Sequence, residues 1–134
     1  MFYEINVRTE FKGYPSITAD VQKMVAESGV KDGICIVSVP HTTAALAITS
    51  FWDKRGLDDM MDEIDRNFPT RVSYKNQDSP YAASGYVKSA TMGSSKMLIV
   101  KDGKLVLGSS QGLVLVEFDG PRERKVFVQL VEVE

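Results

Sequence analysis

The chain has 134 residues, a length that suits one domain with a buried core, and we expect a single domain over residues 1–134. Hydrophobic residues make up 43% and charged residues 25%, the balance of an ordinary globular protein. The formal net charge of −2 gives no general electrostatic basis for binding nucleic acid, so we expect no nucleic-acid partner.

The N-terminal part of the sequence predicts a strand followed by a helix. Residues 3–8 alternate between apolar and polar side chains, as the residues of a half-buried strand do. A helix follows, with Ser16 or Thr18 as its cap and Gly29 at its end. No basic region is followed by a long apolar run here, so we expect no signal peptide, no membrane partner and a cytoplasmic location.

The middle of the sequence predicts two strands, two helices and a long loop. Residues 34–39 are nearly all apolar and predict a fully buried strand, and residues 44–49 predict another. Residues 57–68 carry apolar side chains at helical spacing. The polar, turn-rich residues 69–82 predict a long loop, and residues 82–92 predict a short helix.

The C-terminal part of the sequence predicts closely spaced strands. Residues 97–100 and 105–107 flank Asp102-Gly103, which is a type I′ hairpin signal. Residues 113–118 and 126–133 predict two further strands, and the spacing leaves no room for crossover helices. The sequence therefore predicts an α+β fold with about seven strands and two or three helices.

His41 is the only histidine and follows the apolar residues 34–39. A histidine at the end of a buried strand can titrate near neutrality or bind a metal, and the hydroxyls of Thr42 and Thr43 can orient a ligand. The alternative is a partly buried histidine that is satisfied by backbone groups. Cys35, the only cysteine, excludes an internal disulfide and a thiolate zinc cluster, and its apolar surroundings argue against a nucleophile.

Three other segments carry polar groups that suit either a site or an exposed surface. Asp58 shares one helix face with Asp62 and Asp65, and one of these carboxylates could point into a site, although such a run is usually a solvated face. The basic cluster at residues 120–125, with Arg122, Arg124 and Lys125, suits a phosphate clamp, and a solvated hairpin tip is the alternative. Residues 108–112 resemble a phosphate-cradling loop, but no helix follows them, so a turn or bulge is the alternative.

Several short motifs match one protein family in order and approximate spacing. Residues 41–48 are similar to the signature His-Thr-[Ser/Thr]-Ala-[Ala/Ser]-Leu-x-[Ile/Leu], and residues 88–95 are similar to Lys-[Ala/Ser]-Ser-[Leu/Met]-[Leu/Met]-Gly-x-Ser. Further matches lie at residues 103–108, 111–112, 117 and 120–124. Over essentially its whole length, the chain thus resembles the YjbQ-like family, a set of small proteins whose role is largely uncharacterised.

The resemblance implies a fold, an assembly and a class of ligand. The fold would be a two-layer, sandwich-like arrangement of sheets with helices, assembled as a homotrimer whose sheets pack around the threefold axis. A polar pocket, lined from neighbouring subunits, would bind a metal or an anion. Some members of the family have a secondary thiamine-phosphate synthase activity, which couples a pyrimidine pyrophosphate to a thiazole phosphate. A small phosphorylated ligand or another anion is therefore expected.

The chain departs from the family pattern at four places. Residues 49–50 are Thr-Ser where the family has Asn-Glu, and residues 108–111 are Gly-Ser-Ser-Gln where it has Gly-Thr-Trp-Gln. Asn76 and Tyr86 stand at two positions where members carry histidine. Together with His41 they would hold zinc or another divalent metal poorly, because an amide oxygen is a weak zinc ligand and a phenol is a rare one. We therefore expect metal binding to be weakened or lost.

Three functional hypotheses remain open. In the first, the chain is a divergent enzyme of thiamine-phosphate synthase type, with His41 as general acid or base and Asp58 or Asp78 orienting its ring. In the second, the pocket binds a ligand without catalysis, and in the third the chain is a structural trimer. The residues expected to contact the ligand are Thr42, Thr43, Asn76, Tyr86, Lys88, Gln111, Gly112, Arg122 and Arg124.

Overall fold

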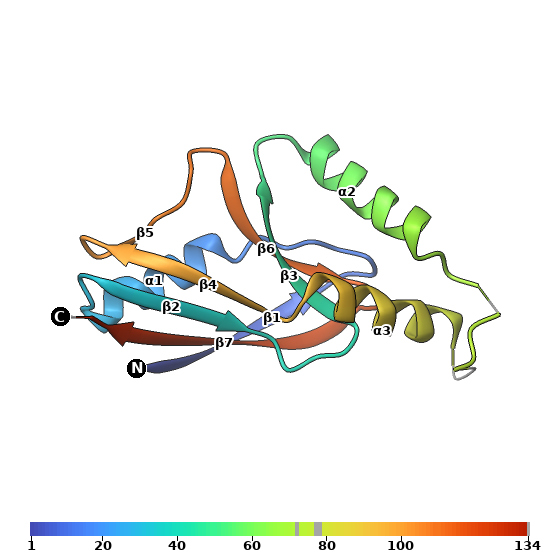
Figure 1. Cartoon of the computed structure of the whole chain (residues 1–134), viewed down its shortest axis with the longest axis horizontal. Coiled ribbons are helices and arrows are strands. Elements are labelled where there is room, and N and C mark those ends of the chain that lie inside the picture. The colour runs from blue at the N-terminus through green and yellow to red at the C-terminus, as the bar shows by residue number, and fades with distance from the viewer. Residues whose placement is uncertain (72, 77–78, 134) are drawn as a thin grey trace.

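The computed structural model describes residues 1–71, 73–76 and 79–133. Among these residues it has seven strands and three helices (Figure 1). The strands are β1 (Phe2–Thr9), β2 (Gly33–Ser38), β3 (Ala44–Ser50), β4 (Ser95–Lys101), β5 (Lys104–Leu105), β6 (Gln111–Glu117) and β7 (Arg122–Glu132). The helices are α1 (Thr18–Ser28), α2 (Lys54–Asn67) and α3 (Pro80–Met92). The predicted α+β class is confirmed.

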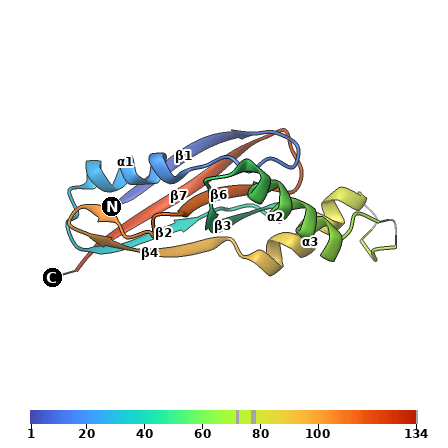
Figure 2. The same cartoon turned by 90° about the horizontal axis from the view of Figure 1, so that it is seen from above.

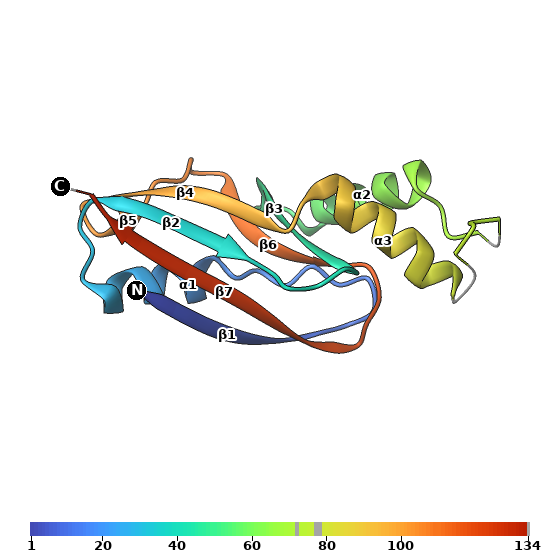
Figure 3. The ribbon, with the colours of Figure 1, turned by 60° about the horizontal axis from the view of Figure 1, so that its bottom comes forward.

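The strands form two antiparallel sheets. The larger has five strands in the order β1-β7-β2-β4-β5, and Figure 3 shows β1, β7, β2 and β4 side by side. The smaller is a ribbon of β3 and β6. The chain before α1 runs along the free edge of β6, where the Ile17 N–H donates to the Leu113 carbonyl at 2.9 Å and the Glu117 N–H donates to the Gly13 carbonyl at 2.9 Å.

The main hydrophobic core lies between one face of the five-stranded sheet and a cover made of α1 and the β3–β6 ribbon. Each strand directs alternate side chains into it, because successive residues of a strand point to opposite faces. Its members include Val21 and Val25 from α1, Leu46 from β3, and Leu113 and Leu115 from β6, all fully buried. Burial raises the pKa of the Cys35 thiol in this core to about 11, so the thiol is protonated at neutral pH.

The other face of the five-stranded sheet is open, which corrects the prediction of a fully buried strand at residues 34–39. In β2, Cys35 and Val37 are buried, whereas Ile34 and Ile36 are only half-buried. The apolar run does not distinguish a strand buried on two faces from one buried on a single face. Within the described residues, only the neighbouring strands flank these side chains, and no second layer covers them.

Helices α2 and α3 lie at one end of the molecule, and α1 and both termini lie towards the other (Figures 1 and 2). Helix α2 packs Leu57 and Met61 into a second apolar cluster, which includes Val116 and Phe118 of the β6 segment. It begins three residues earlier than predicted because Asp53 caps it, accepting from the Arg55 N–H at 2.9 Å.

The local signals of the sequence are confirmed in part. Asp102 and Gly103 both have positive φ, at 52° and 75°, as the predicted type I′ turn requires. Gly29 ends α1 in the left-handed conformation. The predicted cap of α1 is wrong, because Ile17 occupies the cap position and the Thr18 hydroxyl bonds the Leu113 backbone instead. In the described part of the chain, none of the helices has the length and apolar character needed to cross a bilayer.

Candidate functional site

A small polar pocket of about 290 Å³ opens where β2 ends, β7 begins and α3 passes over the chain. Six of the residues singled out in the sequence line it together: His41, Thr42, Thr43, Tyr86, Arg122 and Arg124. They come from three separate segments of the chain, so tertiary structure alone brings them together. Pro40, Ala82 and Asp119 complete the lining.

The orientation of His41 follows from the end of the β2–β7 pairing. Strand β2 leaves the sheet after Ser38, which is paired with Phe127. The next N–H of β7 on that side belongs to Lys125, and it donates to His41 Nε2 at 2.9 Å. The imidazole nitrogen thus takes the place of the backbone carbonyl that β2 would offer to Lys125 if the strand continued. Since the lone pair on Nε2 accepts this bond, neutral His41 carries its proton on Nδ1.

The surroundings of His41 favour this neutral form. Its partial burial lowers the pKa of the imidazole below the ordinary value of 6.5, and the positive charge of Arg124 lowers it further. The negative charge of Glu117 acts in the opposite direction and does not outweigh these effects. At neutral pH, His41 therefore offers the pocket a hydrogen-bond donor, while its single lone pair is already occupied.

A buried ion pair lies beneath the pocket. Arg124 Nε donates to Glu117 Oε1 at 2.7 Å, and Arg124 Nη2 bonds both Glu117 Oε2 and the Thr43 hydroxyl, the latter at 2.8 Å. Burial raises the pKa of the Glu117 carboxyl, but Arg124 and the Thr9 hydroxyl outweigh burial and hold it below its ordinary value. Among the described residues, Arg124 Nη1 has no hydrogen-bond partner and is not among the fully enclosed atoms, so it is the nitrogen available to the pocket.

The rim of the pocket adds further donors. Arg122 Nη2 is paired with Asp119 Oδ2 at 2.9 Å, which raises the pKa of the guanidinium, and its side chain remains largely exposed. Thr42 and Tyr86 are also exposed at the rim. Donor groups therefore outnumber acceptors here, because both carboxylates, Glu117 and Asp119, are already paired with arginine.

Helix α3 is held close to this loop by a glycine and a serine. A Cβ atom at Gly85 would lie 3.2 Å from Thr43 Cγ2, so a larger residue would push the helix away from Thr43. One turn later, the buried Ser89 hydroxyl donates to the Ala44 carbonyl at 2.8 Å. These contacts fix the distance between the Tyr86 and Thr43 walls of the pocket.

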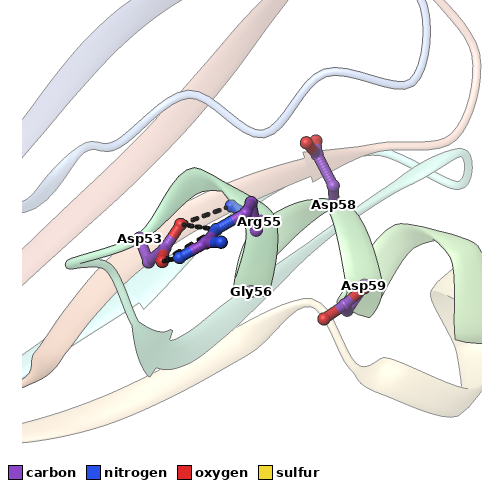
Figure 4. Close-up of a pocket in the computed structure, with 5 residues that line it drawn as sticks. All are labelled: Asp53, Arg55, Gly56, Asp58 and Asp59. Carbon is purple, nitrogen blue, oxygen red and sulfur yellow. Dashed lines mark hydrogen bonds and ion pairs between the residues drawn. The ribbon is translucent and has the colours of Figure 1, made fainter.

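Asp58 and Lys88 lie outside this pocket. Asp58 lies on α2 and accepts hydrogen bonds from Tyr14, which precedes α1, and from Lys54 in its own helix. These two groups hold the pKa of the Asp58 carboxyl below the ordinary value. Figure 4 shows its side chain directed away from the Asp53–Arg55 pair at the start of the same helix. Lys88 is buried and paired with Asp65, so its ammonium ties α3 to α2.

Gln111 and Gly112 lie at the opposite end of the β3–β6 ribbon. In the antiparallel register Ala44 is paired with Glu117, close to His41, whereas Ser50 is paired with Gln111. Six residues of strand separate the two ends, or about 20 Å. A single chain therefore does not bring Gln111 to His41. Asn76 is exposed between α2 and α3 and is not among the pocket residues, and Asp78 lies outside the described residues.

Sequence reasoning did not single out Asp119, and it gave Glu117 only as a match to the family motifs, without a role in the site. Glu117 was detectable in principle, since it is the one charged residue in the apolar run at 113–118. A carboxylate in such a run needs a buried partner, and Arg124 follows seven residues later. Asp119 carries no comparable signal, because acidic residues are common in turns.

The residues of the pocket do not fit a divalent metal. The lone pair of His41 already accepts the Lys125 N–H, and Arg124 and Arg122 place positive charge beside it. Tyr86 and Thr42 offer only hydroxyl groups, which are poor ligands for zinc. Within the described part of the chain, no cluster of three histidine, cysteine or acidic side chains is arranged to hold an ion.

Comparison with known proteins gives the family. The model of the family described as "UPF0047 protein YjbQ-like" matches residues 3–133. A UPF0047 protein of Methanocaldococcus jannaschii is 35% identical over 115 residues, covering 86% of this chain and 82% of the relative, and YugU of Bacillus subtilis is 33% identical, covering 86% of each.

Solved structures agree over nearly the full length. A YbjQ-like protein of unknown function from Sulfolobus solfataricus superposes with a TM-score of 0.93 at 32% identity, covering 99% of this chain and 97% of that one. A YjbQ/UPF0047 protein of Clostridium acetobutylicum gives 0.90 at 40% identity, covering 96% and 99%. The chain therefore belongs to the YjbQ-like UPF0047 family.

Proposed function

We propose that the His41 pocket binds the phosphate group of a small molecule, or a similar oxyanion, and that His41 acts there as a donor. The observation that supports this is the locked tautomer, since Lys125 occupies Nε2 and leaves Nδ1–H as the group His41 can offer. Arg124 Nη1 and the hydroxyls of Thr42 and Tyr86 are further donors around one pocket. Guanidinium groups suit phosphate because they are planar and permanently charged.

The experiment is a titration of the wild-type protein with inorganic phosphate, followed by thermal unfolding and by calorimetry. Phosphate should raise Tm saturably, because a ligand that binds only the folded state stabilises it. Chloride at equal ionic strength should not. Tyr86→Phe should weaken binding about three- to tenfold, as expected for one lost hydrogen bond to an anion. Tyr81→Phe, on the same helix outside the pocket lining, is the matched control. Equal effects of phosphate and chloride would refute the proposal.

A second candidate is transfer chemistry of the thiamine-phosphate synthase type. Displacement of a pyrophosphate requires stabilisation of negative charge more than it requires a base. Arg124, Arg122 and the Nδ1–H of His41 are suited to that task. The test is incubation with the pyrimidine pyrophosphate and the thiazole phosphate. Formation of thiamine phosphate by the wild-type protein, and its loss in His41→Ala, would support transfer. Phosphate binding with no thiamine phosphate formed would show that the pocket binds a ligand without catalysing this reaction.

We further propose that the protein is a homotrimer assembled through the open face of the five-stranded sheet. The apolar side chains of this face, here called the open sheet face, are of two kinds. Exposed are Phe2, Met97, Ile99, Val106 and Val131, and half-buried are Ile34, Ile36 and Phe127. Met97 and Ile99 are 70% and 64% exposed. Contiguous apolar patches of this kind mark interaction surfaces.

A further inference from the structure

A second hollow, of about 440 Å³, lies between the start of α1, the segment after β5 and the start of β6. It is at the end of the β3–β6 ribbon remote from His41, since Gln111 lines it. Its volume is in the range of ligand pockets in proteins. We call it the Gln111 groove. It is separate from the phosphate site proposed above.

The floor of the groove is apolar and is held in place by side-chain hydrogen bonds. Leu105 and Leu107 are half-buried against the main core. The Gln22 amide joins α1 to this segment, because its Oε1 accepts from the Leu105 N–H at 3.0 Å and its Nε2 donates to the Gly103 carbonyl at 3.3 Å. The groove is therefore shaped before any ligand arrives, which lowers the entropic cost of binding.

One wall of the groove is an exposed aromatic ring. Phe51 lies over Gly112, whose Cβ, if present, would be 3.0 Å from Phe51 Cβ, so the glycine leaves room for the ring. The ring stacks on Trp52 with centroids 4.9 Å apart and planes 22° apart. Phe51 remains 43% exposed and Trp52 69% exposed. An exposed, pre-oriented ring at the side of an apolar floor suits the face of a flat ligand.

The rim offers hydrogen-bond donors without charge. Gln111 Oε1 accepts from the Gly108 N–H at 2.8 Å, which fixes the amide, and within the described residues its Nε2 has no hydrogen-bond partner. The hydroxyl of Ser109 lies on the same rim. Among the described residues that line the groove, none is charged. A ligand with a full charge would lose hydration here without gaining an ion pair.

We propose that the Gln111 groove binds a small, neutral, flat molecule that carries a carbonyl or ring-nitrogen acceptor. The ring of the ligand packs between Phe51 and the Leu105–Leu107 floor, and its acceptor takes a hydrogen bond from Gln111 Nε2. The arrangement discriminates against anions, which distinguishes this groove from the His41 pocket.

The experiment uses benzamide as the probe and the fluorescence of Trp52, the only tryptophan of the chain, as the readout. Benzamide should change the emission saturably, with a Kd on the order of millimolar for a ligand of so few atoms. Benzoate, the charged analogue, should bind about tenfold more weakly or not at all. Equal affinity for benzamide and benzoate, or no saturable change with benzamide, would overturn the proposal.

Two variants and one matched control locate the binding. Ala19→Leu adds bulk at an exposed position of the lining and should abolish the benzamide response, whereas Ala26→Leu, exposed on the same helix outside the groove, should retain it. Gln111→Leu should weaken benzamide about five- to tenfold, as expected for one lost hydrogen bond. Unchanged affinity in Ala19→Leu, with circular dichroism showing an intact fold, would place the binding elsewhere and refute the groove.

Discussion

The imidazole of His41 has one lone pair in its neutral form, and the Lys125 N–H occupies it at 2.9 Å. The sequence offered two interpretations, a histidine satisfied by backbone groups and a histidine that orients a ligand. Both hold in part, because the backbone bond satisfies Nε2 and still leaves Nδ1–H for a ligand. Protonation of the ring would break the bond to Lys125 and place a cation beside Arg124. The folded protein therefore resists protonation of His41 more than the unfolded chain does.

This resistance predicts a stability change with pH. Burial and Arg124 lower the folded-state pKa of His41 below 6.5, so between the two values the unfolded chain binds more protons. The free energy of unfolding should fall as the pH drops from about 6.5 towards the folded-state pKa. His41→Gln should remove this part of the dependence. Urea unfolding of the wild type and of His41→Gln from pH 7.5 to pH 5 measures this dependence. If the two free energies of unfolding differ by the same amount at every pH, His41 is not the group responsible.

The buried pair of Arg124 and Glu117 predicts a large loss on removing one partner. Arg124→Met should cost about 3–5 kcal/mol of unfolding free energy, because Glu117 would be left as a buried, uncompensated charge. The double variant Arg124→Met, Glu117→Leu should regain most of the loss, since apolar groups of similar volume tolerate burial. Chemical denaturation measures both. A double variant no more stable than Arg124→Met would show that the pair is not the cause.

At the level of elements, the approach of α3 to the His41 loop decides the width of the pocket. Gly85→Ala should lower the unfolding free energy by about 1 kcal/mol, because overpacking against Thr43 exceeds the gain in helix propensity. Gly56→Ala in α2, where a Cβ meets nothing within 4 Å, should raise it by up to about 1 kcal/mol. Thermal unfolding compares the two. A stabilised Gly85→Ala would contradict the close packing.

Element positions were predictable wherever local signals agree with tertiary packing. Strand β1, the end of α1 at Gly29 and the Asp102-Gly103 turn follow from alternation, glycine and turn chemistry. The cap of α1 was not predictable, because Thr18 bonds β6, a segment distant in sequence. The site was predictable as a set of residue types, but its division into a His41 end and a Gln111 end depends on the β3–β6 register.

At the level of the whole molecule, the open sheet face predicts self-association. Light scattering should give the mass of three chains, and Ile99→Lys should shift the protein towards the monomer, because burying an unpaired charge in an apolar interface is costly. Ala26→Lys adds the same charge on α1, on the covered side of the sheet, and should leave the mass unchanged. A wild-type monomer would refute the trimer.

Local patterning determined the α+β class, the order and approximate positions of the elements, the family and the types of polar residue available for a site. Periodicity, turn chemistry and motif order are properties of neighbours in the chain. Tertiary contacts decided the rest. They alone placed Lys125 against His41, paired Glu117 with Arg124, buried Lys88 against Asp65 and left one face of the sheet open. Each of these depends on which distant segments meet, and one-dimensional spacing does not encode that.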